Sequence, residues 1–310
     1  LIMRDAFIDE LTSLAENDPT IMLLTGDLGF GVLTDYAERF PDQFINVGVA
    51  EQNMSGLATG LALEGYKVYT YSIANFTTLR CLEQIRNDIC YHDANVTLVS
   101  VGAGFSYGQL GVSHFATEDL AILRALPNMM VVSPSDPWEA KILTRQMALI
   151  PGPKYLRIDK GEAGCLEKPS EVCLGKGRVL RDGADITIVS IGAILSESIR
   201  AAEILADSGI ESRVVSLNTL KPFDKSIIFD ACRDTGGMIC IEEHSEIGGL
   251  AGSISEACLK ASISPAFFHS IGLKDEYPTI VGDQKYLRNA YNLNSERIVS
   301  TVLSAIKKAK

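Results

Sequence analysis

The 310-residue chain lacks a Cys-x-x-Cys pair, and its cysteines number seven, which is odd. We therefore expect free thiols rather than a disulfide framework or a zinc site. It also lacks a long apolar run. The longest charge-free window, 95–117, is interrupted by glycines and polar residues, which predicts a buried strand leading into a loop rather than a membrane span. Because the first residues show no signal-peptide pattern, we expect a cytoplasmic protein.

Positive charge is scarce, with 28 Lys and Arg against 39 Asp and Glu and a formal net charge of −11. This balance argues against nucleic acid or an anionic membrane as a partner. It does not exclude a phosphorylated substrate, which needs only a local pair of cationic side chains. A hydrophobic content of 46% over this length is enough for two packed cores.

Short β-branched runs alternate with helical patterns along the chain, which is typical of parallel sheets with crossover helices. Strands are predicted at 21–24, 66–71, 96–101, 129–133, 155–158, 186–190, 213–217, 238–241 and 267–271. Helices are predicted at 4–16, 52–63, 77–90, 118–125, 137–149, 197–207, 227–233, 250–260 and 295–308. Charge and glycine replace this periodicity after residue 159. The sequence therefore predicts two doubly wound α/β domains, 1–165 and 184–310, joined by a linker at 166–183.

Glu51 follows a glycine-containing turn and opens a run of small residues that predicts a helix. An acid in the first turn of a helix complements the helix dipole, which is the simplest interpretation. Close packing by glycine and alanine would also keep the carboxyl group partly dry, so that it could share a proton with a ring nitrogen of a ligand. The spacing alone leaves both interpretations open.

The segment Gly48-Val49-Ala50-Glu51-Gln52-Asn53-Met54 closely resembles the cofactor-pyrimidine domain of transketolase-like enzymes, and the resemblance continues in order from Arg4 to about Ala290. It implies that Glu51 hydrogen-bonds the aminopyrimidine ring of thiamine diphosphate and helps to activate the cofactor for attack on a carbonyl. Phe76 matches the family aromatic residue that stacks on this ring. A plain structural role for Phe76, packing against the helix that follows it, is the alternative.

The resemblance extends the cofactor site to a turn after the first predicted strand, Thr25-Gly26-Asp27-Leu28-Gly29. Doubly wound sheets place ligands at such strand ends. Leu28 would pack near the bend of the cofactor and Asp27 would lie near its thiazolium ring, although a simple strand-end turn explains both residues nearly as well. Arg80 could stack or pair in the pyrimidine pocket.

Residues 102–111 form a glycine-rich loop after a predicted strand, but their spacing, G-x-G-x-x-x-G, argues against a dinucleotide fingerprint. The loop leads to His114, which the resemblance places opposite the substrate, where it would assist proton transfer. A histidine in such a position is often only structural. Leu110 stands where the family often carries an acid that recognises the configuration of a hydroxyl group on the sugar donor. The resemblance therefore does not establish that this chain shares the family's usual sugar specificity.

Arg4 and Arg157 align with the phosphate-binding arginines of the family. Two guanidinium groups bind phosphate oxygens well, so the resemblance implies a clamp for a phosphorylated sugar. A family serine expected near Gly31 is missing, and we expect the phosphate site to differ in that detail.

The Gly-Asp-Gly motif with which this family binds diphosphate and Mg²⁺ does not occur; Gly26-Asp27-Leu28 and Gly282-Asp283-Gln284 are partial matches. The resemblance therefore implies the carboxy-terminal subunit of a split transketolase. A separate amino-terminal subunit would hold the metal and the diphosphate, in an α₂β₂ complex that includes homodimer contacts. The chain alone should be inactive. The resemblance of Glu242–Gly252 to the transketolase carboxy-terminal domain implies a mainly structural role there.

The expected reaction is transfer of a two-carbon ketol unit from a ketose phosphate to an aldehyde acceptor. The β subunit of a 2-oxoacid dehydrogenase and a deoxyxylulose-phosphate synthase-like enzyme are alternatives, since both share the fold and the glutamate. A non-catalytic scaffold subunit is an alternative of another class. The joint presence of Glu51, Phe76 and His114 argues against the scaffold, which needs none of them. The sequence names neither the sugars nor the partner.

Overall fold

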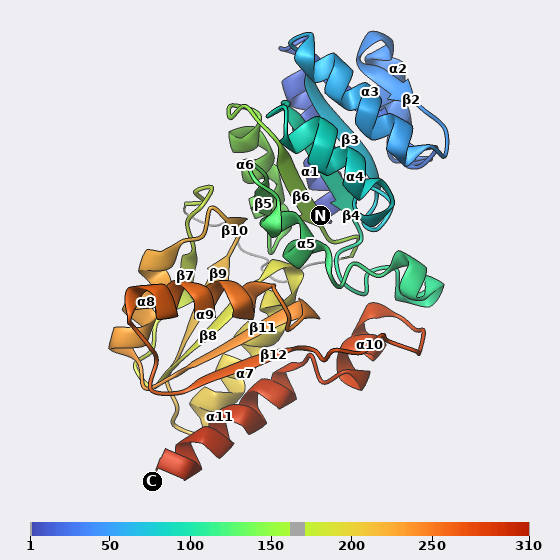
Figure 1. Cartoon of the computed structure of the whole chain (residues 1–310). Coiled ribbons are helices and arrows are strands. Elements are labelled where there is room, and N and C mark those ends of the chain that lie inside the picture. The colour runs from blue at the N-terminus through green and yellow to red at the C-terminus, as the bar shows by residue number, and fades with distance from the viewer. Residues whose placement is uncertain (1, 162–170, 310) are drawn as a thin grey trace.

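The computed structural model describes residues 2–161 and 171–309, and it contains two β-sheets, each covered by helices (Figure 1). The seven-stranded sheet has the order β10-β5-β6-β4-β3-β1-β2. Its strands are β1 (Ile21–Thr25), β2 (Phe44–Asn46), β3 (Lys67–Ile73), β4 (Val96–Val101), β5 (Met130–Val132), β6 (Lys154–Ile158) and β10 (Thr219–Lys221). All neighbours pair in parallel except β10, which comes from the second half of the chain and pairs antiparallel with β5.

Both faces of the first sheet are buried, since every residue of β1, β4 and β6 is buried. Successive residues of a strand point to opposite faces. Accordingly, Leu23 packs with α1 (Met3–Ala15) and α6 (Pro137–Met147). Its neighbour Leu24 packs with α3 (Glu51–Leu63) and α5 (Asp119–Ala125) on the other face.

The second sheet has five strands in the order β12-β11-β8-β9-β7. They are β7 (Arg178–Arg181), β8 (Ile186–Ile191), β9 (Ser212–Leu217), β11 (Met238–Ser245) and β12 (Phe268–Leu273). One face packs against α7 (Leu195–Asp207) and α11 (Ser295–Ala309), and the other against α8 (Lys225–Asp234) and α9 (Leu250–Ala261). The short helix α10 (Gln284–Ala290) lies beside the long loop that follows β4 (Figure 1).

The nine predicted strands and eight of the nine predicted helices correspond to elements of the structure, and the two α/β domains of the predicted fold class are confirmed. Asp136 caps α6 as its sequence position suggests, since its Oδ1 accepts the backbone N–H of Glu139 at 2.8 Å. The stretch 166–183 predicted as a linker is not a linker throughout. It contains strand β7, which pairs antiparallel with β9 at the edge of the second sheet. Residues 166–170 of that stretch lie outside the described residues.

The helix predicted at 77–90 is wrong as a single α-helix. The segment contains a 3₁₀ turn (Leu79–Cys81), a short α-turn α4 (Leu82–Gln84) and a π-helical turn (Ile85–Cys90). Thr78 explains part of the irregularity, because its hydroxyl donates to the carbonyl of Ala74 at 2.6 Å and competes with regular helical bonding. The sequence also gives no prediction of α2 (Thr34–Arg39), β2, β10 or α10.

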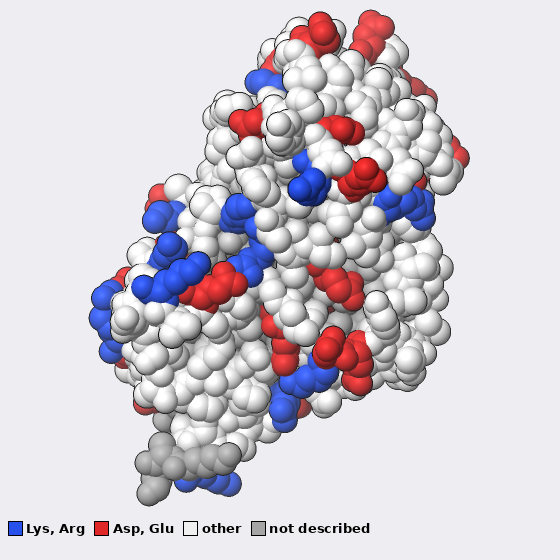
Figure 2. All heavy atoms as spheres, in the orientation of Figure 1, with Lys and Arg blue, Asp and Glu red and all other residues white. Residues whose placement is uncertain are grey.

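Charged side chains of both signs are interspersed over the face shown in Figure 2, separated by uncharged surface. No helix within the described residues is long and apolar enough to cross a membrane. The six cysteines in the described part of the chain are free thiols, as the sequence predicts.

Candidate active site

Glu51 is the first residue of α3 and is only 2% exposed. The turn after β1 packs directly against it, since a Cβ at Gly26 would lie 3.5 Å from Cγ of Glu51. The carboxylate is paired with Arg80, whose Nη1 donates to Oε1 at 2.9 Å. Arg80 itself is 43% exposed, so the pair is an almost buried acid covered by a cation at the surface.

Arg80 connects Glu51 to two of the other predicted site residues. Its guanidinium carbon lies 3.9 Å from the centroid of the Phe76 ring, in a cation–π arrangement. The Phe76 ring in turn meets the ring of His114 edge-on, with centroids 5.1 Å apart. Glu51, Arg80, Phe76 and His114 thus form one continuous series of contacts, although 63 positions separate the first from the last.

His114 ends a 3₁₀ turn (Val112–His114) that lies over the Phe76 segment. The amide of Asn75 donates to the carbonyls of Val112 and Ser113 at 3.4 and 3.3 Å, and the Ser113 hydroxyl lies 2.9 Å from Nδ1 of His114. Partial burial, and secondarily the positive charge of Arg80, lower the pKa of His114 below its ordinary value. His114 is therefore neutral at pH 7, with a ring nitrogen able to accept a proton.

The turn that contains Asp27 and Leu28 lies next to Glu51 through Gly26. Asp27 has a left-handed backbone with φ of 60° and is exposed. Asn46 stabilises this conformation, since its Oδ1 accepts the N–H of Asp27 at 3.0 Å and its Nδ2 donates to the Asp27 carboxylate at 3.2 Å. Leu28 is half-buried. Contact of either residue with a cofactor stays a prediction.

The two arginines of the predicted phosphate clamp, Arg4 and Arg157, differ in their exposure to solvent and in their partners. Arg4 is 24% exposed and pairs with Asp5 at 3.0 Å. Arg157 is 2% exposed, and its Nε donates to Asp119 at 2.7 Å while its Nη2 donates to the carbonyls of Ala116 and Glu243 at 2.8 and 3.0 Å. Because its donors point into the protein, this geometry argues against the predicted substrate role of Arg157 and for a structural one.

Lys160, two residues beyond the end of β6, is a cation of the site that the sequence analysis missed. Its Nζ lies 4.6 Å from the centroid of the Tyr107 ring, in the glycine-rich loop. Arg4 also lies near this ring, since its positive charge limits the rise in the Tyr107 pKa that burial causes. Lys160 thus contacts the Tyr107 ring, and the charge of Arg4 acts on the same side chain. The sequence pattern could not separate Lys160 from the charged stretch that begins at residue 159.

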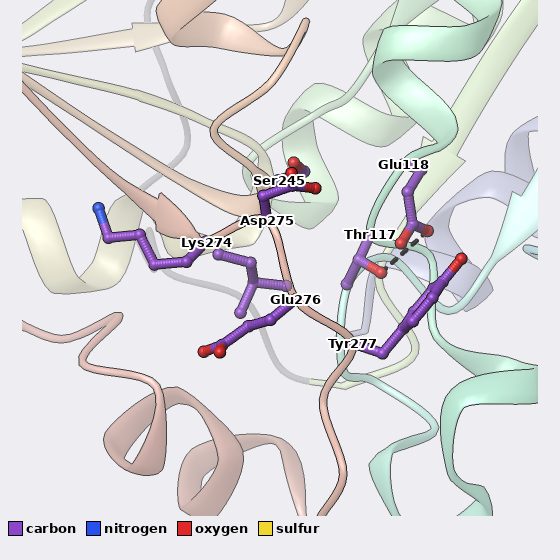
Figure 3. Close-up of a pocket in the computed structure, with 8 residues that line it drawn as sticks. Thr117, Glu118, Ser245, Lys274, Asp275, Glu276 and Tyr277 are labelled. Atoms are coloured by element: carbon purple, nitrogen blue, oxygen red, sulfur yellow. Dashed lines mark hydrogen bonds between the residues drawn. The ribbon is translucent and has the colours of Figure 1, made fainter.

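A cleft of about 210 Å³ lies beyond the other end of this loop, between the two halves of the chain (Figure 3). Thr117 and Glu118 form one wall, and the segment after β12 forms the other. The full lining is Thr117, Glu118, Ser245, Leu273, Lys274, Asp275, Glu276 and Tyr277. Lys274 extends away from Glu118 in this view and pairs with Glu246. None of the predicted site residues lines this cleft.

Two family models together match most of the sequence: the transketolase pyrimidine-binding domain at residues 1–164 and the transketolase C-terminal domain at residues 175–298. The chain belongs to the transketolase family. In this chain the pyrimidine-binding domain precedes the C-terminal domain.

Several relatives of the transketolase family align over nearly the whole chain. A protein of Methanocaldococcus jannaschii named as a putative transketolase C-terminal section is 35% identical, over 99% of this chain and 96% of its own length. One of the subunits of the apulose-4-phosphate transketolase of Phocaeicola vulgatus is also 35% identical, over 98% of this chain and 97% of its own. A 1-deoxy-D-xylulose-5-phosphate synthase of Desulforudis audaxviator is 33% identical over 98% of this chain but only 48% of its own length.

A solved structure with a similar fold is described as a split-gene transketolase in an inactive β₄ tetramer. It is 34% identical, covers 99% of both chains and has a TM-score of 0.90. The chain thus corresponds over nearly its whole length to carboxy-terminal subunits of split transketolases.

Arg157→Ala should destabilise the chain strongly, because the variant leaves the carboxylate of Asp119 buried without its cation. Breaking a buried pair in this way costs about 3–5 kcal/mol of unfolding free energy. Urea denaturation of the isolated chain measures this loss. Arg233→Ala, which removes an exposed pair with Asp230, is the control and should change stability by no more than about 0.5 kcal/mol. Equal effects of the two variants would contradict the structural role of Arg157.

Arg80→Met should raise the pKa of His114, because the variant removes a nearby positive charge while it keeps apolar contact with Phe76. Burial should still hold that pKa below the ordinary histidine value. NMR titration of the histidine ring signals in the isolated chain measures the shift, with His114→Asn to assign the resonance. Arg86→Met, which removes an exposed arginine nearby, is the control and should leave the titration unchanged. An unchanged His114 titration in Arg80→Met would show that the two groups do not interact.

Proposed function

We propose that this chain is the carboxy-terminal subunit of a thiamine diphosphate-dependent transketolase that moves a two-carbon ketol unit from a ketose phosphate to an aldehyde acceptor. The series of contacts from Glu51 through Arg80 and Phe76 to His114 supports this proposal most directly. It unites a buried acid, an aromatic face and a neutral histidine, which a scaffold subunit would not require.

The residues around Glu51 fit the aminopyrimidine ring of this cofactor. Arg80 already places a planar group of N–H donors against the Phe76 ring and hydrogen-bonded to the Glu51 carboxylate. An aminopyrimidine is likewise flat and carries N–H groups, and in addition its ring nitrogen can take up a proton. Because Arg80 is 43% exposed, it can move aside without disrupting the core.

Thiamine diphosphate, when bound, supplies the nucleophilic carbon and the electron sink for cleavage and formation of the carbon–carbon bond. Glu51 would hold and exchange the proton on the pyrimidine nitrogen, and its burial keeps water from competing for that contact. Phe76 would orient the ring by stacking, which contributes on the order of 1 kcal/mol. His114, neutral at pH 7, would exchange a proton with a substrate oxygen.

The surroundings of Glu51 also support a partner subunit. Several loops near Glu51 and His114 expose large apolar side chains, whereas a monomer normally covers such groups. They are Phe30, Val49, Leu79, Leu110 and Val112. We infer that an amino-terminal subunit, carrying the Mg²⁺ and diphosphate site, covers this surface in an α₂β₂ complex located in the cytoplasm.

For the substrate phosphate, we propose Arg4 and Lys160 in place of the pair Arg4 and Arg157. Both are accessible to solvent and both lie near Tyr107 in the glycine-rich loop. A phosphate between them would receive charge-assisted hydrogen bonds from two directions.

A reaction that begins from a 2-oxoacid is a second candidate, favoured by the 33% identity to a deoxyxylulose-phosphate synthase. Release of CO₂ from pyruvate by the reconstituted complex would support this candidate. Release of an aldose phosphate from a ketose phosphate would support ketol transfer.

Glu51→Gln should abolish most of the turnover, because an amide cannot exchange the proton that the carboxylate exchanges. We expect a loss of about 10²–10⁴-fold, in the range of a general acid–base contribution. Calorimetric titration with thiamine diphosphate and Mg²⁺ should show binding to the chain mixed with its amino-terminal subunit, and weaker binding when the mixture contains Glu51→Gln. Glu64→Gln, the same change at the exposed end of α3, is the matched control.

Tight cofactor binding by the unmixed chain would contradict the need for a partner. Absence of binding in the mixture would contradict the cofactor assignment itself.

Lys160→Ala should lower kcat/KM for a phosphorylated ketose roughly tenfold or more, as expected when one charged hydrogen bond is lost. The effect on the unphosphorylated ketose should be small, so the ratio of the two values is the decisive measurement. Lys260→Ala, which changes an exposed lysine at the end of α9, serves as control. An equal loss for both sugars would exclude a phosphate contact by Lys160.

A further inference from the structure

The loop 104–116, which carries Tyr107 and leads to His114, is closed at its base. Gly104 and Ala116 exchange two backbone hydrogen bonds of 3.1 and 3.0 Å. Next to this base, the rings of Phe105 and Phe115 pack edge to face with centroids 5.0 Å apart, and both are buried. His114 lies two residues before this base, so its position depends on how firmly the base is held.

Glu243, in strand β11 of the second sheet, holds the beginning of this loop. Its Oε1 accepts the backbone N–H of Phe105 at 2.6 Å, and its Oε2 accepts a hydrogen bond from Nε of Arg288 in α10 at 2.6 Å. The approach is so close that a Cβ at Gly104 would lie 2.5 Å from Oε1 of Glu243. Only glycine at position 104 permits this contact, and Gly104 also has a positive φ of 55°.

The end of the loop is tied to the same residue of β11. Nη2 of Arg157 donates to the carbonyl of Ala116 at 2.8 Å and to the backbone carbonyl of Glu243 at 3.0 Å. Glu243 thus contacts the first half of the loop through its side chain and the second half through Arg157. Both ends of the loop are fixed to one position of the second sheet.

Gln284, the first residue of α10, completes the connection. Its Nε2 lies 2.9 Å from Oδ2 of Asp159, 3.1 Å from Oε1 of Glu243 and 3.3 Å from the Ser106 hydroxyl. Ser106 in turn donates to Oδ1 of Asp159 at 2.7 Å. The amide therefore separates two nearly buried carboxylates and supplies N–H donors to both. Without it, among the described side chains only the guanidinium of Arg288, which lies 2.5 Å from Oε2 of Glu243 and 3.9 Å from Oδ2 of Asp159, would remain between the two carboxylates.

The backbone provides a further contact between the same two parts. The N–H of Gly282, just before α10, donates to the carbonyl of Gly108 at 3.3 Å. A Cβ at Gly108 would lie 2.5 Å from the Gly282 oxygen, so the two segments meet without room for a side chain. The segment 282–288 is thus packed along the first part of the loop.

We infer that Glu243 and Gln284 are positioning residues: through them the second domain fixes loop 104–116, and with it the placement of His114. This gives the carboxy-terminal domain a direct part in arranging the candidate active site, beyond support of the assembly. The catalytic consequence rests on the proposed function, whereas the fixing of the loop is a property of this chain alone.

Gln284→Ala tests the inference with readouts that need no cofactor or partner. Loss of the bridging amide should speed hydrogen exchange of the backbone amides of 105–116 roughly tenfold, the factor that corresponds to one lost hydrogen bond. The NMR titration of His114 should shift as well, because its distance from Arg80 and its burial are no longer fixed. The global melting temperature should change little, since Gln284 is only partly buried.

Asn289→Ala is the matched control, because this exposed residue of the same helix contacts only Asn294 among side chains of the described residues. Glu243→Gln is a second variant that keeps an acceptor near Phe105 but removes the charge opposite Arg288. It should speed exchange in the same segment.

Exchange and titration identical in Gln284→Ala and Asn289→Ala would overturn the inference. In the reconstituted complex, Gln284→Ala should also lower kcat, because a loop that is held less firmly places His114 less accurately. A complex that performs no ketol transfer, while the isolated chain still shows the faster exchange, would contradict the proposed function and leave the positioning role supported.

Discussion

The fully buried ion pair between Arg157 and Asp119 is the interaction around which the two halves of the chain are assembled. Burial of two charges is costly, and additional hydrogen bonds to the same groups offset part of that cost. Here the Asp119 carboxylate also accepts the Tyr155 hydroxyl at 2.5 Å, and the guanidinium reaches two backbone carbonyls. These partners come from β6, α5, the end of the glycine-rich loop and β11. A shift of α5 against β6 would break the ion pair, and a shift of residue 116 or of β11 would remove a hydrogen bond from the buried guanidinium.

The candidate active site also depends on how separate segments are held together, because its four central side chains come from three of them. Glu51 belongs to α3, Phe76 and Arg80 to the irregular segment after β3, and His114 to the loop after β4. Each segment begins at the carboxyl end of a parallel strand, where doubly wound sheets bring loops together. The sheet brings the three segments close together, whereas the hydrogen bonds to the second domain fix the loop that carries His114. Electrostatic coupling within the group is a consequence, since Arg80 both pairs with Glu51 and depresses the pKa of His114.

Much of this could be predicted from the sequence where local signals are strong. Buried strands such as β4 are largely apolar runs with clear ends, and Asp136-Pro137 fits a helix start with a cap before a proline at the first helical position. Glu51 was identifiable because a glycine turn, an acid and small residues follow one another. The structural role of Arg157 could not be predicted, since resemblance to a motif does not tell whether an arginine points to solvent or into the core. Strands β7 and β10 are short edge strands whose pairing depends on distant partners, and no local pattern encodes that.

Arg80 shows why the site should discriminate among planar ligands. Its ion pair and its cation–π contact are partly exposed, and interactions of this kind contribute about 0–1 kcal/mol each. A ligand can therefore displace the guanidinium at small cost. Glu51, however, is 2% exposed, and displacement by a flat ligand that has neither an N–H donor nor a ring nitrogen able to share a proton would leave its carboxylate buried and unpaired. Such a penalty is typically several kcal/mol, which is far more than stacking on Phe76 could return. The buried acid thus requires that any ring bound against Phe76 present an N–H donor or a nitrogen that can share a proton with the carboxyl group, whereas stacking on Phe76 selects only for a flat ring.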